Sequence, residues 1–145
     1  MRALSLKLLV VAALFLTGCM QHDGDIGDWF GTWHLESMTV NGVDDSAYEQ
    51  NYFFQFQTDK VRLSRIEPTY PDLLEECFGR WEQTDNTLTL DFSYTSASGS
   101  YWTPWPGTYL AKGVNRLHID KLTSKHLILT LDSPDQTVVY TLRKQ

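Results

Sequence analysis

The sequence predicts an all-β fold, a single eight-stranded antiparallel up-and-down barrel. First, apolar residues from Trp29 onward recur with a period of two, and no segment of helical length carries a sustained apolar stripe. Second, short turn sequences separate the candidate strands, so that neighbours in sequence can close hairpins. Third, a sheet with one apolar face must bury that face, and closure into a barrel also removes exposed edges. A two-sheet β-sandwich is the alternative architecture.

The candidate strands are runs of alternating residues bounded by turn residues. They are Thr32–Val40, Tyr52–Gln57, Val61–Ile66, Phe78–Gln83, Thr87–Tyr94, Arg116–Leu122, Leu127–Leu131 and Val138–Arg143, with Tyr109–Lys112 as a ninth if it counts separately. The alternation is clearest at Leu88, Leu90 and Phe92, which we expect to share the buried face.

The first 18 residues have the layout of a secretory signal. Arg2 and Lys7 give a basic start, an apolar run follows at 8–16, and the small residues Thr17 and Gly18 precede Cys19. A membrane-spanning helix needs roughly 20 apolar residues, and this run is about half as long. We therefore expect residues 1–18 to be a cleaved export signal.

The tetrapeptide Leu16-Thr17-Gly18-Cys19 resembles a bacterial lipobox. The resemblance implies cleavage before Cys19, a diacylglycerol thioether on its sulfur and an acylated new amino terminus. Two or more acyl chains anchor a protein stably, since each buried methylene contributes about 0.8 kcal/mol. We expect a lipoprotein of the bacterial cell envelope, on the outer rather than the inner membrane, with the periplasmic or surface face left open. An ordinary secretory signal with a chance cysteine is the alternative.

Lipidation of Cys19 decides what Cys77, the other cysteine, can do. With Cys19 acylated, Cys77 has no intrachain disulfide partner and is expected to be a small buried side chain. Without acylation, a bridge between Cys19 and Cys77 is the competing interpretation.

The remaining chain is organised as a short tether followed by one domain. Residues 19–28 are acidic and small and are expected to be a flexible tether, whereas 29–145 hold the predicted barrel. Removing Arg2 and Lys7 changes the formal net charge from −6 to −8. Such a charge argues against a nucleic-acid partner and leaves the lipid on Cys19 as the membrane attachment.

The tripeptide Gly31-Thr32-Trp33 opens the first strand and resembles the lipocalin and calycin family, whose first strand carries such a tryptophan at the closed end of the barrel. The resemblance implies that Gly31 and Trp33 close the barrel and that a basic residue of the last strand packs over the indole. Arg143 is the candidate. Further stretches resemble the short lipocalin-like lipoproteins of Bacteroides-type bacteria, namely GTWHLESMTVNG, NTLTLDFSY, IDKLTSKHLILTL and VVYTLRK.

The sequence shows no constellation of reactive residues. It holds no H-E-x-x-H, C-x-x-C, G-x-S-x-G or phosphate-binding glycine loop, and its four histidines are not at metal-ligand spacing. We therefore expect neither an enzyme nor a metal or other cofactor.

Aromatic residues are the candidate binding groups. Phe54 and Phe56 should point into the barrel, where filling of the core is favoured over lining of a cavity. Tyr101, Trp102 and Trp105 lie in a Ser/Gly- and Pro-rich loop that forms either a ligand platform or a lid over one barrel end.

Two functions remain open at the level of sequence. One is the binding of a small apolar or amphipathic ligand at the barrel mouth. The other is a solid-core structural lipoprotein that docks a protein or glycan through its aromatic loop. Large inward side chains favour the second, and the relevant positions are Phe54, Phe56, Trp81, Leu90 and Phe92.

Overall fold

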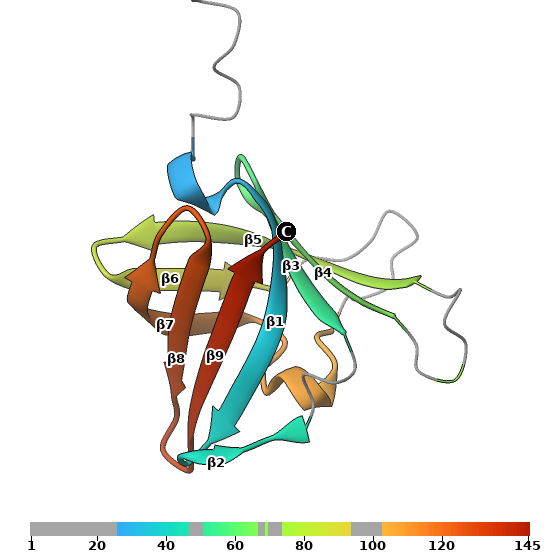
Figure 1. Ribbon diagram of the computed structural model, residues 1–145, viewed down its shortest axis with the longest axis vertical. Helices are drawn as coiled ribbons and strands as arrows, with labels where there is room; N and C mark the ends of the chain where they lie inside the picture. The colour runs from blue at the N-terminus through green and yellow to red at the C-terminus, as the bar shows by residue number, and fades with distance from the viewer. Residues whose placement is uncertain (1–25, 47–50, 67–68, 70–73, 94–102) are drawn as a thin grey trace, which may run out of the picture.

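The computed structural model describes residues 26–46, 51–66, 69, 74–93 and 103–145. Within them the chain forms one antiparallel sheet whose strands curl around a common axis (Figure 1). The strands are β1 (Gly31–Val40), β2 (Val43–Asp44), β3 (Tyr52–Gln57), β4 (Lys60–Ile66), β5 (Leu74–Thr84), β6 (Thr87–Asp91), β7 (Val114–Leu122), β8 (His126–Asp132) and β9 (Thr137–Lys144). Two short 3-10 helices, η2 (Gly27–Trp29) and η4 (Pro106–Thr108), complete the described elements.

The sheet closes on itself through its first and last long strands. From β3 to β9 each strand pairs with the next in sequence, and β1 pairs with both β3 and β9. The β1–β9 register runs from Trp33 opposite Lys144 to Val40 opposite Val138. Because β2 pairs only with β1, the closed wall has eight strands. The predicted eight-stranded barrel is confirmed, and the sandwich alternative is excluded by this closure.

The core occupies the inside of the barrel. Leu88, Leu90 and Phe92 share the buried face, as their alternation predicts. Phe54 and Phe56 also point inward and are 1% and 0% exposed. Phe53, which precedes Phe54 in β3, lies on the outer wall and stacks on His34 with 4.8 Å between ring centroids.

A glycine in β5 allows two strands to approach closely. A Cβ at Gly79 would lie 2.7 Å from both the Asp91 carbonyl oxygen and the ring of Phe92. Any larger residue would therefore displace Phe92 from the core.

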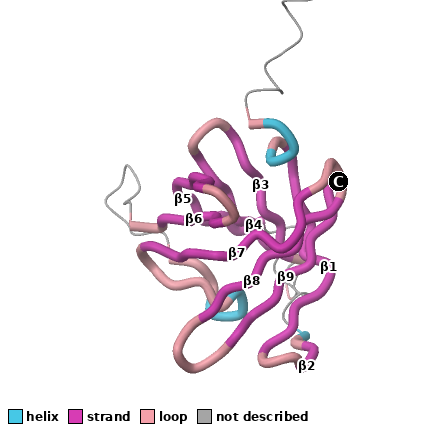
Figure 2. The backbone as a smooth tube through the Cα atoms, turned by 90° about the vertical axis from the view of Figure 1, so that its left-hand side faces the viewer, coloured by secondary structure: helices cyan, strands magenta, loops and turns pink. Residues whose placement is uncertain are grey.

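The two ends of the barrel differ in what covers them (Figures 1 and 2). We call the end that holds η2 and the carboxyl terminus the closed end. The opposite end, which holds β2 and η4, is the mouth.

The segment Tyr109–Lys112 is not a strand, contrary to the prediction. Tyr109 adopts left-handed backbone angles (φ 59°) directly after η4. The side-chain amide of Asn115 accepts a hydrogen bond from the Ala111 amide and donates one to the Ala111 carbonyl, both at 2.8 Å. A side chain thus satisfies backbone groups that a strand would pair with a neighbour. The two-residue strand β2 was not predicted.

Several predicted features lie outside the described residues. They include the export signal 1–18, Cys19, Tyr101 and Trp102. The tether range 19–28 is described only at its end, where Ile26 packs against the core and η2 begins at Gly27.

Candidate ligand site at the barrel mouth

Trp33 seals the closed end of the barrel. The strand enters it through Gly31, whose φ of 120° lies in the region that favours glycine. The Trp33 side chain is fully buried, and its indole Nε1 donates a hydrogen bond to the Trp29 carbonyl oxygen at 3.1 Å. The end-closing position predicted for Gly31 and Trp33 is where the structure places them.

The basic residue over this indole is Lys144, not Arg143. Lys144 Nζ lies 4.8 Å from the centroid of the Trp33 ring and donates a hydrogen bond to the Asp28 carbonyl oxygen at 2.7 Å. In the register, Lys144 is opposite Trp33, whereas Arg143 is opposite His34 and faces outward. The Arg143 guanidinium is instead 3.9 Å from the Glu36 carboxylate, and its side chain is 58% exposed.

Phe56 belongs to an aromatic cluster at the closed end, away from the mouth. Its ring centroid lies 4.9 Å from that of Trp29 and 5.2 Å from that of Trp81, and the two indoles are 5.3 Å apart. The Trp29 indole donates a hydrogen bond to the Gln83 side chain at 2.8 Å. Phe56 is therefore part of the seal rather than a group that an entering ligand would meet.

Trp105 is the described aromatic residue of the loop that lies at the mouth. Its ring stacks on Tyr52 with 5.9 Å between centroids and 30° between planes. The guanidinium carbon of Arg65 lies 5.2 Å from the Trp105 centroid, within the range of a cation–π contact. Trp105 is only partly buried.

Arg65 brings a charge to the inner side of the mouth. It follows the buried Val61 and Leu63 at alternate positions of β4, so its side chain starts on the interior face. Its Nε donates to the carboxylate of Glu75, the residue opposite in β5, and it also hydrogen-bonds the Tyr52 hydroxyl. The Arg65 and Glu75 side chains are 21% and 32% exposed. Burial raises the pKa of Tyr52, which keeps its hydroxyl neutral.

The segment from Trp105 to Leu110 crosses the mouth. Thr108 is fully buried. Its carbonyl oxygen accepts a hydrogen bond from the hydroxyl of Tyr140, an inward-facing residue of β9. The Tyr109 hydroxyl donates to Asp45 at 2.5 Å, and this hydrogen bond raises the pKa of Tyr109. We call this part of the aromatic loop, residues 105–110, the lid, and Trp105 lies at its start.

Large side chains occupy the interior below the lid. Phe54, in the middle of β3, is tilted against Tyr140 with 6.3 Å between centroids. Leu90 and Phe92 are fully buried, whereas Trp81 is half-buried at the closed end. A ligand that enters past Trp105 would meet these groups within a short distance of the mouth.

Comparison with known proteins identifies the family. The model of the lipocalin-like domain family matches residues 14–144, nearly the whole chain. The chain belongs to the lipocalin-like domain family. No curated protein matches it significantly.

Solved structures share the fold of this lipocalin-like barrel. A lipocalin-like protein from Bacteroides uniformis superimposes with a TM-score of 0.56 at 18% identity, over 82% of this chain and 100% of the other. An uncharacterized protein from Bacteroides eggerthii gives 0.55 at 19% identity, over 81% and 99% of the two chains. These superpositions show a shared fold. The family comprises binding proteins that are generally not enzymes.

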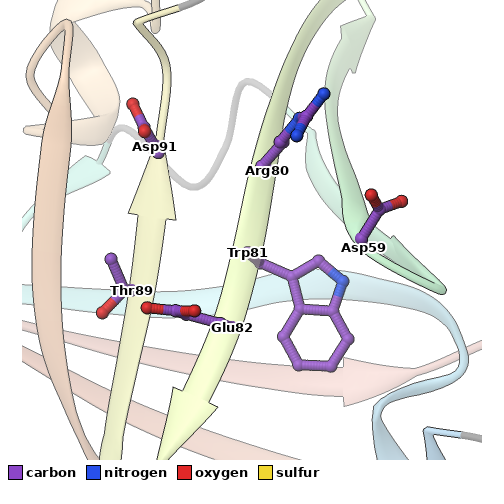
Figure 3. A pocket seen from close by; sticks show the side chains of 6 residues that line it. All are labelled: Asp59, Arg80, Trp81, Glu82, Thr89 and Asp91. Atoms are coloured by element: carbon purple, nitrogen blue, oxygen red, sulfur yellow. The ribbon is translucent and has the colours of Figure 1, made fainter.

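Outside the barrel, β5 and β6 border a shallow groove of about 330 Å³ (Figure 3). Asp59 and Trp81 lie near Arg80, and Asp91 is opposite Arg80 on the neighbouring strand β6. A smaller hollow of about 100 Å³ lies on the outer wall over β3 to β5, beside Arg62 and Phe78. Both are lined mainly by charged or amide side chains, unlike the aromatic mouth.

The described residues hold neither a metal site nor a reactive thiol. Across 26–46, 51–66, 69, 74–93 and 103–145, no group of three or more His, Cys, Asp or Glu side chains could hold a metal ion. Cys77 is buried, and burial raises its pKa to about 12, so its thiol is protonated at neutral pH. Neither described helix, at three residues each, is long enough to cross a membrane.

Sequence reasoning missed the polar half of the mouth. Arg65, Glu75 and Tyr109 were not among the candidates, although the spacing of Val61, Leu63 and Arg65 places the arginine on the inward face. The partner of Tyr109 could not have been found, because Asp45 is 64 residues away in sequence.

Proposed function

We propose that this lipocalin-like protein is a lipid-anchored component of the bacterial cell envelope that binds a small amphipathic ligand at its mouth. Barrels of this family typically bind small ligands. The observation that carries the proposal is the inward-facing Arg65, held between the Tyr52 hydroxyl and the Glu75 carboxylate and lying over the ring of Trp105.

This arrangement suits a ligand with one polar and one apolar part. The Arg65 guanidinium carries five N–H donors in a fixed plane and stays charged, so it favours an acceptor such as a carboxylate. The adjoining faces of Tyr52 and Trp105 offer planar apolar surface. Because Phe54 and Tyr140 occupy the space below, we expect the ligand to bind shallowly, with its head group at Arg65 and its apolar part against Trp105.

The membrane attachment is proposed from the sequence Leu16-Thr17-Gly18-Cys19. Acylation of Cys19 would leave the barrel tethered to the envelope, and we propose the outer membrane as its location. Intact mass measurement of the protein from its own host tests this directly. A diacylglycerol and an acyl group on Cys19 are expected, and an unmodified Cys19 would contradict the proposal.

Native mass spectrometry of the protein from its host tests ligand binding. We expect a copurified small molecule that is lost from the variants Trp105→Ala and Arg65→Gln. Phe53→Ala is the matched control, because Phe53 is an aromatic residue of the same sheet that lies on the outer wall. Retention of the molecule by both mouth variants would contradict binding at the mouth.

A second function is favoured by the crowded interior. Phe54, Phe56, Leu90 and Phe92 are all buried, which is the pattern expected of a barrel without a deep ligand cavity. Such a barrel would serve as a structural lipoprotein that docks a protein or glycan through its aromatic loop. A native mass equal to that of the protein without a bound small molecule, together with no uptake from a host lipid extract, would favour this function over ligand binding.

A further inference from the structure

We propose that the closed end of the barrel is the surface that lies against the lipid bilayer, so that the mouth faces away from the membrane. This inference rests on the proposed acylation of Cys19 and is independent of ligand binding. Ile26 and η2 lie at the closed end, opposite β2 and η4 (Figures 1 and 2).

Polar and apolar contacts fix Asp28 and Trp29 to the closed end. The Trp29 carbonyl accepts from the Trp33 indole, and the Asp28 carbonyl accepts from Lys144. The Trp29 side chain is 3% exposed and packs against Phe56 and Trp81. The segment that leads into β1 is therefore held at the closed end, and moving it along the barrel wall would require disrupting this aromatic cluster.

The link from Cys19 to Ile26 is short compared with the barrel. Seven residues span at most about 25 Å when fully extended and about 15 Å as a flexible coil. The ten residues of β1, at about 3.3 Å each and tilted by about 40°, give a wall about 25 Å high. If the mouth faced the bilayer, the link would have to be fully extended along the whole wall, whereas a coil suffices when the closed end faces it.

The surface beside the chain entry suits a membrane interface. Phe30 is 40% exposed, and Arg143 is exposed on the adjacent β9. Lys125 is also exposed and lies next to β9, because its carbonyl oxygen accepts a hydrogen bond from the Lys144 amide. An aromatic ring among cations is favourable at the headgroup level of an anionic leaflet. The acidic residues of this end, Asp28 in η2 and Asp59 and Asp85 on the β3–β4 and β5–β6 turns, are exposed as well, so we expect contact at the corner formed by Arg143 and Lys125.

The mouth also carries exposed acidic residues. Asp44, Asp132 and Asp135 are exposed there, and anionic lipid would repel them. This end also exposes Val43 and Leu74, which are 70% and 52% exposed and would be the contact residues in the reverse orientation. A ligand or partner would reach an outward-facing mouth from the aqueous side, without passing through the bilayer surface.

Fluorescence quenching of the full acylated protein in vesicles tests the orientation. Single labels are placed by Lys125→Cys at the closed end and by Asp135→Cys at the mouth, both exposed turn positions. The vesicles contain phosphatidylethanolamine, phosphatidylglycerol and a lipid with a quencher in its headgroup. Buried Cys77 should take up little label, and the parent protein measures that background.

We expect stronger quenching of the Lys125→Cys label than of the Asp135→Cys label. Equal quenching, or stronger quenching at position 135, would overturn the orientation, and an unacylated Cys19 would overturn it together with the anchor. Loss of ligand from the mouth variants is measured separately, so a failure of the orientation can be distinguished from a failure of ligand binding.

Discussion

Trp33 is the side chain on which the closed end of the barrel depends. It is fully buried, contacts the Lys144 ammonium and donates a hydrogen bond to Trp29. Replacement of a large buried aromatic residue by alanine typically costs about 3–5 kcal/mol, since a cavity remains. We expect Trp33→Ala to lower the free energy of unfolding by this amount in urea denaturation. A loss below about 1 kcal/mol would show that Trp33 does not act as the seal.

The two basic residues at the end of β9 are expected to differ in their effect on stability. Lys144 lies over the Trp33 ring and binds the Asp28 carbonyl, whereas Arg143 makes only a long, exposed contact with Glu36. We expect Lys144→Gln to destabilise the protein by about 1 kcal/mol, which is typical of a partly exposed cation–π contact together with its hydrogen bond. Arg143→Gln should change stability by less than about 0.5 kcal/mol. Equal losses in thermal unfolding would contradict this assignment.

Among the secondary-structure elements, η4 is linked to the inside of the barrel by the Tyr140 hydroxyl. The Tyr140 hydroxyl donates to the Thr108 carbonyl, and both groups are buried. Tyr140→Phe keeps the ring and leaves that carbonyl without its partner, at a cost of about 1–3 kcal/mol. We expect faster amide hydrogen exchange at Thr108 and Tyr109, while exchange in β8 stays unchanged. Equal acceleration in both places would indicate global destabilisation rather than release of the lid.

The strands could be predicted because one apolar face is enough to determine them. In β6 and β8 every second residue is apolar, and the structure buries Leu88, Leu90, Leu127 and Leu129 as expected. At Tyr109–Lys112 the same rule failed, because η4 imposes left-handed angles at Tyr109 and the Asn115 side chain pairs with Ala111. Such long-range and side-chain partners leave no periodic signal.

The candidate site was predictable only in part, because it depends on register. The tryptophan of the closing motif could be found from its place at the start of the first strand. The choice between Arg143 and Lys144 depends on which of them is opposite Trp33, and the β1–β9 pairing contains a bulge between Leu35 and Ser37. A shift of one residue exchanges the inner and outer faces of a strand. Sequence alone does not locate such a bulge.

For the barrel as a unit, burial of acidic hydroxyl and thiol groups predicts a loss of stability at alkaline pH. Burial raises the pKa of Cys77 from 9.0 to about 12, and it also raises the pKa of Tyr140 and of Tyr52. The folded protein therefore holds these protons more tightly than the unfolded chain. Their contribution to stability is complete below pH 9, declines once the unfolded groups ionise, and is lost for Cys77 near pH 12.

Urea unfolding at pH 7, 9, 10 and 11 measures this decline. One proton held only by the folded state gives a slope that approaches about 1.4 kcal/mol per pH unit. Between pH 9 and 10 the decline should come mainly from Cys77, because the unfolded tyrosines ionise only near pH 10. Cys77→Ala is thus expected to lower stability at pH 7 through lost packing and to flatten the decline between pH 9 and 10. Parallel curves for the two proteins would mean that the thiol ionises as readily in the folded barrel as in the unfolded chain.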